Sequence, residues 1–157
     1  MNLRPFKQED ADLLSKWLLD PDYSKFFRNW VVIPSYDDLR NFPNFSANMV
    51  LVIEENGKSI GMVVAFDFNS KKQTCEVGII IEKEFHKSGH GREAIKRWYQ
   101  FLFDHVNLRK IKVHVVDDWL VKELMEQHGF KFEGVEIEEC FHGGKFVNEY
   151  RLVLFRR

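Results

Sequence analysis

The spacing of apolar residues along the chain predicts a mixed α/β domain. Apolar runs, continuous or alternating with polar residues, predict strands at residues 2–6, 49–54, 58–68, 74–81 and 109–116. Apolar residues three or four positions apart predict helices at residues 10–19, from a glycine-containing loop to about residue 105, and from about residue 119 to 128. Two further strands close the chain.

Turn signals between these segments predict how the strands are connected. Asn56-Gly57 is the strongest short signal for a β-hairpin, and the sequence His-Gly-Gly-Lys at residues 142–145 predicts a second hairpin. Residues 35–38 match a helix-capping box, which predicts a short helix to about residue 42. The element order therefore predicts one domain over residues 1–157: an antiparallel meander, a βαβ crossover and a C-terminal hairpin.

The loop between the strand ending at residue 81 and the following helix carries the clearest chemical signal. Gly89 and Gly91 stand directly before apolar residues with helical spacing. Glycines at a helix start allow several backbone N–H groups to point outward together. Those donors and the positive end of the helix dipole bind phosphate without side chains. The pattern therefore predicts a phosphate site.

Several motifs resemble the GNAT superfamily of N-acetyltransferases. His86-x-x-Gly89-x-Gly91 is similar to that family's pyrophosphate loop, Gln/Arg-x-x-Gly-x-Gly/Ala. Residues 108–115 resemble its fifth strand, and residues 126–130 resemble the Gly-Phe ending of its last helix. Residues 130–134 and 142–150 resemble the closing hairpin of its ribosomal-protein-alanine and polyamine acetyltransferase branch. The resemblance implies a GNAT-like fold that transfers acetyl from acetyl-coenzyme A (acetyl-CoA) to a primary amine.

The resemblance also implies which residues bind the cofactor. Backbone groups of the last strand residues before the loop hold the pantetheine arm and polarise the thioester carbonyl, while the loop holds the pyrophosphate. The cofactor-binding residues expected are Ile79, Ile80, Ile81, His86, Lys87, Ser88, Gly89, His90, Gly91, Arg92 and Asp118. Asp118 stands where the family has asparagine. An ionised aspartate only accepts hydrogen bonds, and this position also suits a helix N-cap.

Glu76 is the expected proton acceptor. Acetyl transfer needs an amine that has lost its proton, yet an alkylamine has a pKa near about 10. A carboxylate near the acceptor removes that proton directly or through water. Related acetyltransferases often have a glutamate on this strand. The alternative is that Glu76 is a structural residue bonded to neighbouring backbone.

Two positions leave the catalytic mechanism open. The family protonates the leaving thiolate with a tyrosine or a serine in its last helix, and the corresponding residues here are Met125 and Val121. Coenzyme A leaves readily as a thiolate because thiol pKa values lie near about 8.5. Two alternatives to an enzyme therefore stand: a weak or inactive coenzyme A-binding sensor or regulatory module, and an interaction domain that keeps only the fold.

Two other interpretations of the loop fit the sequence less well. Gly89-x-Gly91-x-x-Ala94 also matches the dinucleotide fingerprint, with Asp117 near the ribose-binding position. However, residues 82–88 separate the strand from the first glycine, and repeated βαβ units are missing. His86 and His90 have no third ligand nearby, as a zinc site requires. We therefore expect no metal.

The composition of the chain limits which binding partners and which cellular compartment we expect. The net charge of −1 provides no basic field for nucleic acid, and the apolar runs are too short to span a bilayer. The two cysteines, Cys75 and Cys140, favour a reducing compartment and show no activating pattern for a covalent acyl relay. We therefore expect a cytoplasmic monomer or homodimer in which a small-molecule, polyamine or peptide amine attacks directly in a ternary complex.

Overall fold

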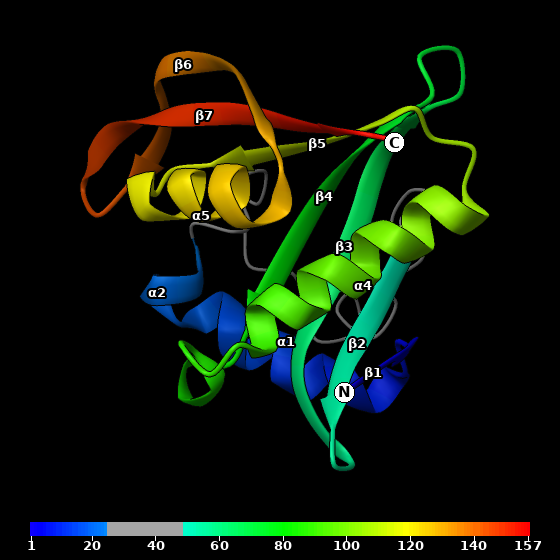
Figure 1. The fold of residues 1–157 in the computed structure, drawn as a ribbon. Helices are drawn as coiled ribbons and strands as arrows, with labels where there is room; N and C mark the ends of the chain where they lie inside the picture. The colour runs from blue at the N-terminus through cyan, green and yellow to red at the C-terminus, as the bar shows by residue number, and fades with distance from the viewer. Residues whose placement is uncertain (25–48) are drawn as a thin grey trace. The chain divides into compact units, whose positions relative to one another are not determined.

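The computed structural model describes residues 1–24 and 49–157, so the helix predicted at residues 35–42 lies outside the described residues. The described residues form two compact units (Figure 1). The first contains residues 1–24, 49–66 and 78–98, and the second contains residues 67–77 and 99–157. A single domain over residues 1–157 stays a prediction.

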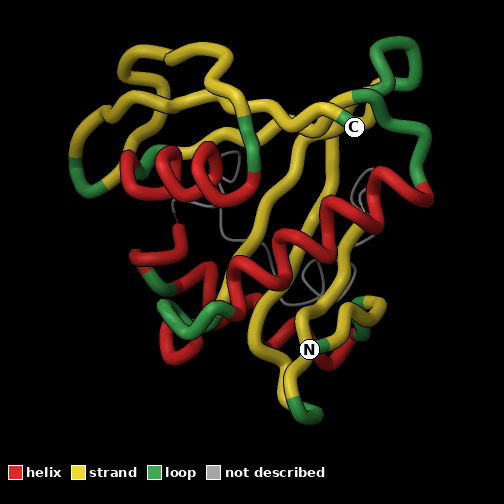
Figure 2. Tube along the Cα trace, in the orientation of Figure 1, coloured by secondary structure: helices red, strands yellow, loops and turns green. Residues whose placement is uncertain are grey.

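The strands of the first unit follow the predicted meander. β1 (Asn2–Pro5) pairs antiparallel with β2 (Met49–Glu55), β2 pairs antiparallel with β3 (Lys58–Asn69), and β4 (Thr74–Ile81) is the next strand in order. Asn56 and Gly57 join β2 to β3 with φ angles of +50° and +78°. A type I′ hairpin turn requires this pair of left-handed residues. The predicted hairpin is therefore confirmed, and Figure 2 shows its turn.

The helices of the first unit cover an apolar core. A 3-10 turn, η1 (Gln8–Asp10), leads into α1 (Ala11–Leu19), and α2 (Pro21–Ser24) follows. The predicted helix therefore starts one residue later than expected, because residues 8–10 adopt the tighter turn. One face of α1 packs in a cluster with strand residues; the buried members are Ala11, Leu14, Trp17, Tyr23, Val50, Met62 and Ile80. Leu14 and Trp17 are fully buried, as their helical spacing predicts.

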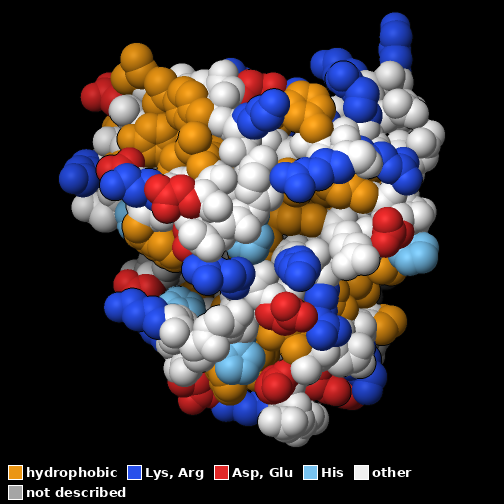
Figure 3. All heavy atoms as spheres, in the orientation of Figure 1, with side chains coloured by type: hydrophobic (Ala, Val, Ile, Leu, Met, Phe, Trp, Pro, Cys, Tyr) orange, Lys and Arg blue, Asp and Glu red, His pale blue; other side chains and the backbone are white. Residues whose placement is uncertain are grey.

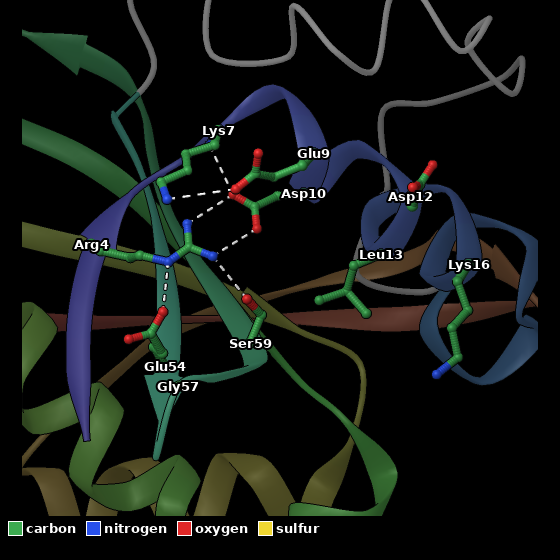
Figure 4. Close-up of a pocket in the computed structure, with 10 residues that line it drawn as sticks. All are labelled: Arg4, Lys7, Glu9, Asp10, Asp12, Leu13, Lys16, Glu54, Gly57 and Ser59. Atoms are coloured by element: carbon green, nitrogen blue, oxygen red, sulfur yellow. Dashed lines mark hydrogen bonds and ion pairs between the residues drawn. The ribbon is translucent and has the colours of Figure 1, made fainter.

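A charged network joins β1 to η1. Arg4 donates two hydrogen bonds to the Asp10 carboxylate, at 2.9 and 2.8 Å, and others to Glu54 and Ser59 (Figure 4). The backbone N–H of Lys7 also donates to Asp10, at 2.7 Å. Burial alone would raise the pKa of Asp10, but the hydrogen bonds from Arg4 and Lys7 outweigh it and lower that pKa.

The lowered pKa of Asp10 predicts a pH-dependent loss of stability. A carboxyl whose pKa is lower in the folded state stabilises the fold above its unfolded pKa, near about 3.9, and that stabilisation is lost as pH falls through the folded value. Asp10→Asn is expected to reduce the free energy of unfolding at pH 7 by about 2–3 kcal/mol, because Arg4 loses a charged partner. Urea unfolding at pH 7 and pH 3 tests this.

A matched control lies next to this network. The Glu9 side chain is 75% exposed, and its Oε1 lies 3.5 Å from Lys7 Nζ. Surface pairs of this kind contribute little. Glu9→Gln should therefore unfold like the parent protein at both pH values. Equal stability of Asp10→Asn and the parent at pH 7 would contradict the assigned role of Asp10.

The closing hairpin lies in the second unit, and the predicted crossover runs along the chain through residues of both units. β4 pairs in parallel with β5 (Lys110–Val115), and α4 (His90–His105) connects the two strands along the chain. β6 (Lys131–His142) and β7 (Lys145–Phe155) form the hairpin, and β7 also pairs antiparallel with β5. The strand order in this unit is β4-β5-β7-β6. The predicted mixed α/β fold is confirmed in both units.

The last helix ends as its sequence predicts. α5 (Asp118–His128) stops at Gly129, which is left-handed with a φ angle of +73°. The N–H of Phe130 then donates to the Leu124 carbonyl at 3.1 Å, and the Phe130 ring packs 5.2 Å from that of Tyr99. Glycine ends helices in this way because it adopts a left-handed conformation at little cost. No helix in the described parts of the chain has the length and apolar character that crossing a bilayer requires.

Candidate active site

The predicted phosphate loop lies in the first unit, between β4 and α4. A 3-10 turn, η3 (Lys83–Phe85), follows β4, and Lys87 and Gly89 then adopt left-handed φ angles of +60° and +86°. The N–H of Glu93 donates to the Gly89 carbonyl at 3.1 Å. The first N–H groups of a helix have no carbonyl acceptor within the helix, because no turn comes before them. The loop therefore delivers the chain to the N-terminal end of a 16-residue helix, where backbone donors and the helix dipole favour an anion.

The two glycines differ in what a side chain would meet. A Cβ atom on Gly91 would have Ile81 Cδ1, at 3.9 Å, as its nearest neighbour, which is an ordinary contact. A Cβ atom on Gly89 would meet nothing within 4 Å, but its positive φ angle disfavours other residues. The fold therefore has room for a side chain at Gly91, whereas the backbone conformation favours glycine at position 89.

The side chains of the loop mostly bond to the loop itself. His86 Nε2 lies 2.7 Å from the Ile81 carbonyl oxygen, so this nitrogen carries the hydrogen and donates it. The predicted phosphate contact of His86 is then restricted to Nδ1, which donates only when the ring is protonated. The Ser88 hydroxyl donates to the Phe85 carbonyl at 2.6 Å and also contacts His90 Nδ1. Lys87 and Arg92 are exposed, as cationic phosphate contacts require.

Glu82 is a site-proximal residue that the sequence did not single out. It follows β4 directly, is 8% exposed, and accepts hydrogen bonds from Lys16 Nζ at 3.0 Å and Trp17 Nε1 at 3.2 Å. Its N–H donates to the Ile60 carbonyl at 2.8 Å. Glu82 thus ties α1 and β3 to the point where the loop begins. A carboxylate directly after an apolar strand was its only signal in the sequence.

In the second unit, Glu76 bonds to a histidine. His114 Nδ1 lies 3.0 Å from Glu76 Oε2, and the two side chains are 11% and 14% exposed. The parallel register sets Glu76 opposite Lys112, and His114 lies two residues further on the same face of β5. When Nδ1 donates to the carboxylate, Nε2 of a neutral imidazole is an acceptor. A carboxylate-oriented imidazole is chemically able to take a proton.

The structure corrects the N-cap role expected for Asp118. Asp117 occupies the N-cap position, with an extended backbone and no side-chain capping bond, and Asp118 is the first residue of α5. Tyr150, opposite Val115 in the β5–β7 register, donates a hydrogen bond to Asp118 instead. This bond to a carboxylate raises the pKa of Tyr150. The Asp118 carboxylate is therefore held by β7 rather than used as a cap.

Three other features of the described residues limit the possible chemistry. Burial raises the pKa of the Cys75 thiol to about 12, which keeps this cysteine protonated and unreactive. Met125 is 41% exposed on α5, and neither it nor Val121 carries a hydroxyl. Within residues 1–24 and 49–157, no three His, Cys, Asp or Glu residues are grouped to hold a metal ion.

A cavity of about 620 Å³ lies in the first unit, away from the loop (Figure 4). None of the predicted site residues lines it. The lining residues are Arg4, Lys7, Glu9, Asp10, Asp12, Leu13, Lys16, Glu54, Gly57 and Ser59. Arg4 lies among Asp10, Glu54 and Ser59 in Figure 4 and bonds to all three. Because these charges largely compensate one another, we interpret the side chains around the cavity as a solvated network that stabilises the fold.

Comparison with known proteins matches most of the chain to acetyltransferases. The family model described as an acetyltransferase (GNAT) domain matches residues 1–131. Spermidine N(1)-acetyltransferase of Vibrio cholerae serotype O1 is 31% identical over 153 residues, which cover 94% of this chain and 82% of that protein. The spermidine N(1)-acetyltransferase of Escherichia coli K12 is 26% identical over 168 residues, covering 99% and 86%.

Solved structures of acetyltransferases have the same fold as this chain. Spermidine N-acetyltransferase from Vibrio cholerae in complex with CoA and spermine has a TM-score of 0.87 at 26% identity, covering 98% of this chain and 94% of that one. A probable acetyltransferase has a TM-score of 0.81 at 18% identity and shows the fold alone. The arrangement of strands and helices predicted from the sequence therefore has counterparts among acetyltransferases of known structure.

Proposed function

Because the chain belongs to the acetyltransferase (GNAT) family, we propose that its acceptor is a polyamine. The chain is an N-acetyltransferase that moves acetyl from acetyl-CoA to a primary amine. The family resemblance drawn from its motifs is thus confirmed. The names of its relatives specify spermidine, and the solved Vibrio cholerae complex contains spermine. These names support the choice of a polyamine over a peptide N-terminus.

The cofactor contacts rest on the backbone of the loop. The left-handed residues Lys87 and Gly89 turn the chain into the N-terminus of α4, which supports a pyrophosphate bound by backbone N–H groups. This loop geometry is the single observation that carries the proposed binding of acetyl-CoA. The backbone of Ile79–Ile81 lies outside the β4–β5 register, which covers only Thr74–Glu76. We assign the pantetheine arm to that part of β4.

Glu76 and His114 are assigned to proton removal from the acceptor. The amine nitrogen must lose a proton to attack the thioester carbonyl, and the Glu76–His114 pair offers a carboxylate bonded to an imidazole. After the C–N bond forms, the C–S bond breaks and coenzyme A leaves as a thiolate. Met125 and Val121 have no hydroxyl, so the thiolate takes its proton from water.

Asp118 and Tyr150 are assigned to orienting the pantetheine arm. Tyr150 donates to Asp118, which fixes the carboxylate and leaves its remaining lone pairs for an amide N–H of pantetheine. Tyr150→Phe is expected to weaken acetyl-CoA binding about tenfold, the effect of one hydrogen bond to a charged group. Adenosine 3′,5′-bisphosphate lacks pantetheine and should bind the variant as it binds the parent. Calorimetry with both ligands makes the comparison.

A double-variant cycle separates this role from a general packing effect. If Tyr150 acts through Asp118, Tyr150→Phe should add nothing to the loss caused by Asp118→Ala. Asp118→Asn restores the family residue and should keep most of the affinity. Equal weakening of acetyl-CoA and adenosine 3′,5′-bisphosphate by Tyr150→Phe would show that the hydroxyl only stabilises the fold.

We further place the enzyme in the cytoplasm. The two cysteines of the chain, Cys75 and Cys140, form no disulfide. Reduced thiols suit a compartment that keeps cysteine reduced.

An acceptor screen tests the proposed substrate. Acetyl-CoA is mixed with spermidine, spermine, an aminoglycoside and a peptide with a free N-terminus, and thiol release is recorded for each. The polyamines are expected to give the highest kcat/KM. Faster turnover of the peptide or the aminoglycoside would overturn the polyamine assignment. Tight acetyl-CoA binding without thiol release in any mixture would count against the assigned proton-transfer residues.

A further inference from the structure

Glu82 stands between the end of β4 and the phosphate loop, and all three of its polar groups are bonded. Its N–H donates to the Ile60 carbonyl on β3 at 2.8 Å, and its own carbonyl accepts the N–H of Phe85 at 2.9 Å, which closes η3. Its carboxylate accepts hydrogen bonds from Trp17 Nε1 at 3.2 Å and from Lys16 Nζ at 3.0 and 3.2 Å. One residue therefore joins β3, α1 and the turn that leads into the loop.

Burial separates the carboxylate contacts of Glu82 from the other ion pairs around η3. Lys and Arg side chains lie beside Asp and Glu side chains at many points of the surface in Figure 3, and exposed ion pairs add little to stability. The Lys83–Asp20 pair belongs to this exposed kind, since its side chains are 46% and 30% exposed. The Glu82 side chain is 11% exposed, and Trp17 is fully buried. Removing the carboxylate would leave the buried indole N–H without its acceptor, which costs more than losing an exposed pair.

The bonds of the following residues transmit the position of Glu82 to the loop. The N–H of Phe85 bonds to the Glu82 carbonyl, and the N–H of His86 bonds to the Lys83 carbonyl at 3.0 Å. His86 Nε2 also donates to the Ile81 carbonyl at 2.7 Å. A shift at residue 82 therefore moves the residues that carry the phosphate-binding N–H groups. Such groups bind an anion well only when they are held in advance around one point.

We propose that Glu82 is a positioning residue for acetyl-CoA, because its bonds to α1 hold the phosphate loop in its binding conformation before the cofactor arrives. Glu82 acts through the loop and is assigned no contact with the cofactor itself. A loop that is already ordered loses less conformational freedom on binding, so it binds more tightly than one that must be ordered. This inference rests on the proposed binding of the pyrophosphate by the loop.

Calorimetry and steady-state kinetics on the full chain test the inference. Glu82→Ala is expected to weaken acetyl-CoA binding about tenfold, the equivalent of one hydrogen bond to a charged group. Adenosine 3′,5′-bisphosphate keeps the first phosphate of the pyrophosphate and should lose a similar factor. The KM for acetyl-CoA should rise while kcat stays near the parent value, because the Glu76–His114 pair is unchanged. Glu82→Gln keeps an oxygen for Trp17 Nε1 and should recover most of the affinity.

Two lysine substitutions are matched in charge but differ in their contact with Glu82. Lys16→Met and Lys83→Met each remove one ammonium group near the start of the loop. Lys16 bonds to Glu82, whereas Lys83 bonds to Asp20 and Asp22. Lys16→Met should weaken acetyl-CoA binding about threefold, and Lys83→Met should bind like the parent. Equal weakening by both would show a general effect of positive charge and would overturn the role of Glu82.

The lysine pair also decides the matter if Glu82→Ala does not fold. Both lysine side chains are exposed, at 64% and 46%, so their substitution leaves the core intact. Circular dichroism verifies that each variant is folded at the temperature of the binding measurement. A fall in kcat without a rise in KM for acetyl-CoA in Glu82→Gln or Lys16→Met would contradict a role in cofactor positioning.

A double variant separates this inference from the assignment of the loop. If Glu82 acts through the loop, Glu82→Ala should cost less affinity in a Gly91→Val background, where the loop no longer holds the pyrophosphate, than in the parent. Equal losses in both backgrounds would contradict that route. Parent affinity in a folded Glu82→Ala protein, together with weakened binding in Gly91→Val, would overturn the role of Glu82 alone. Parent affinity in Gly91→Val would overturn the loop assignment, and this inference with it.

Discussion

Replacing Glu76 with glutamine is expected to lower kcat by about a hundredfold or more, the range of general base catalysis. Glutamine has nearly the same shape but cannot accept the amine proton. The His114–Glu76 bond, at 3.0 Å, joins two side chains that are more than four-fifths buried, so the substitution also changes what orients the imidazole. Acetyl-CoA affinity should stay close to that of the parent, because the phosphate loop is unchanged.

Steady-state kinetics over a pH series identifies which group of the pair takes the proton. A base must be unprotonated to act, so the rate of the parent enzyme is expected to fall at acidic pH. His114→Asn removes the imidazole and keeps Glu76. If His114 is the direct acceptor, this variant should lose as much kcat as Glu76→Gln, and the acidic limb should disappear in both. If Glu76 acts directly, His114→Asn should lose less.

A control and a contrary outcome complete this test. Glu136 also forms an ion pair within the second unit, with Arg151 at 3.3 Å, but lies on the outer strand β6. Glu136→Gln should therefore keep the parent kcat. Should Glu76→Gln keep both the parent kcat and the parent pH profile, Glu76 would be structural, and the amine would reach the site already neutral.

Local signals in the sequence were sufficient for most elements of the fold. The Asn56-Gly57 pair specified its hairpin because few residues other than glycine and asparagine adopt two successive left-handed conformations. Gly129 specified the end of α5 for the same physical reason. Such signals depend only on neighbouring residues, so they can be recognised before any tertiary contact is known.

Those local signals could not predict which side chains bond to one another in the candidate site. Glu76 and His114 are 38 residues apart in the chain, and only the parallel register brings them into contact. The N-cap alternative for Asp118 was wrong for a related reason. Its sequence position suited an N-cap, but Asp118 is the first residue of the helix. Its carboxylate accepts a hydrogen bond from Tyr150 on β7. Contacts across strands are set by register, which single residues do not encode.

Replacing Gly91 with valine is expected to weaken acetyl-CoA binding by about a hundredfold while the protein stays folded. The fold has room for the first side-chain atom, whose nearest neighbour would be Ile81 Cδ1 at 3.9 Å. The substitution is therefore expected to lower the affinity for acetyl-CoA and not the stability of the fold. A branched side chain keeps the pyrophosphate away from the backbone N–H groups. Loss of two charge-assisted hydrogen bonds corresponds to about this change in affinity.

A series of substitutions in the loop distinguishes blocked access from strain. Gly91→Ala should bind acetyl-CoA nearly as well as the parent, because the family pattern admits alanine and the space for one carbon is present. Gly89→Ala should instead lower the unfolding temperature, because alanine is disfavoured at the φ angle of +86°. Calorimetry and thermal unfolding measure the two effects separately. Unchanged affinity in a folded Gly91→Val protein would remove the pyrophosphate from this loop, because the helix N-terminus would then be accessible without being used.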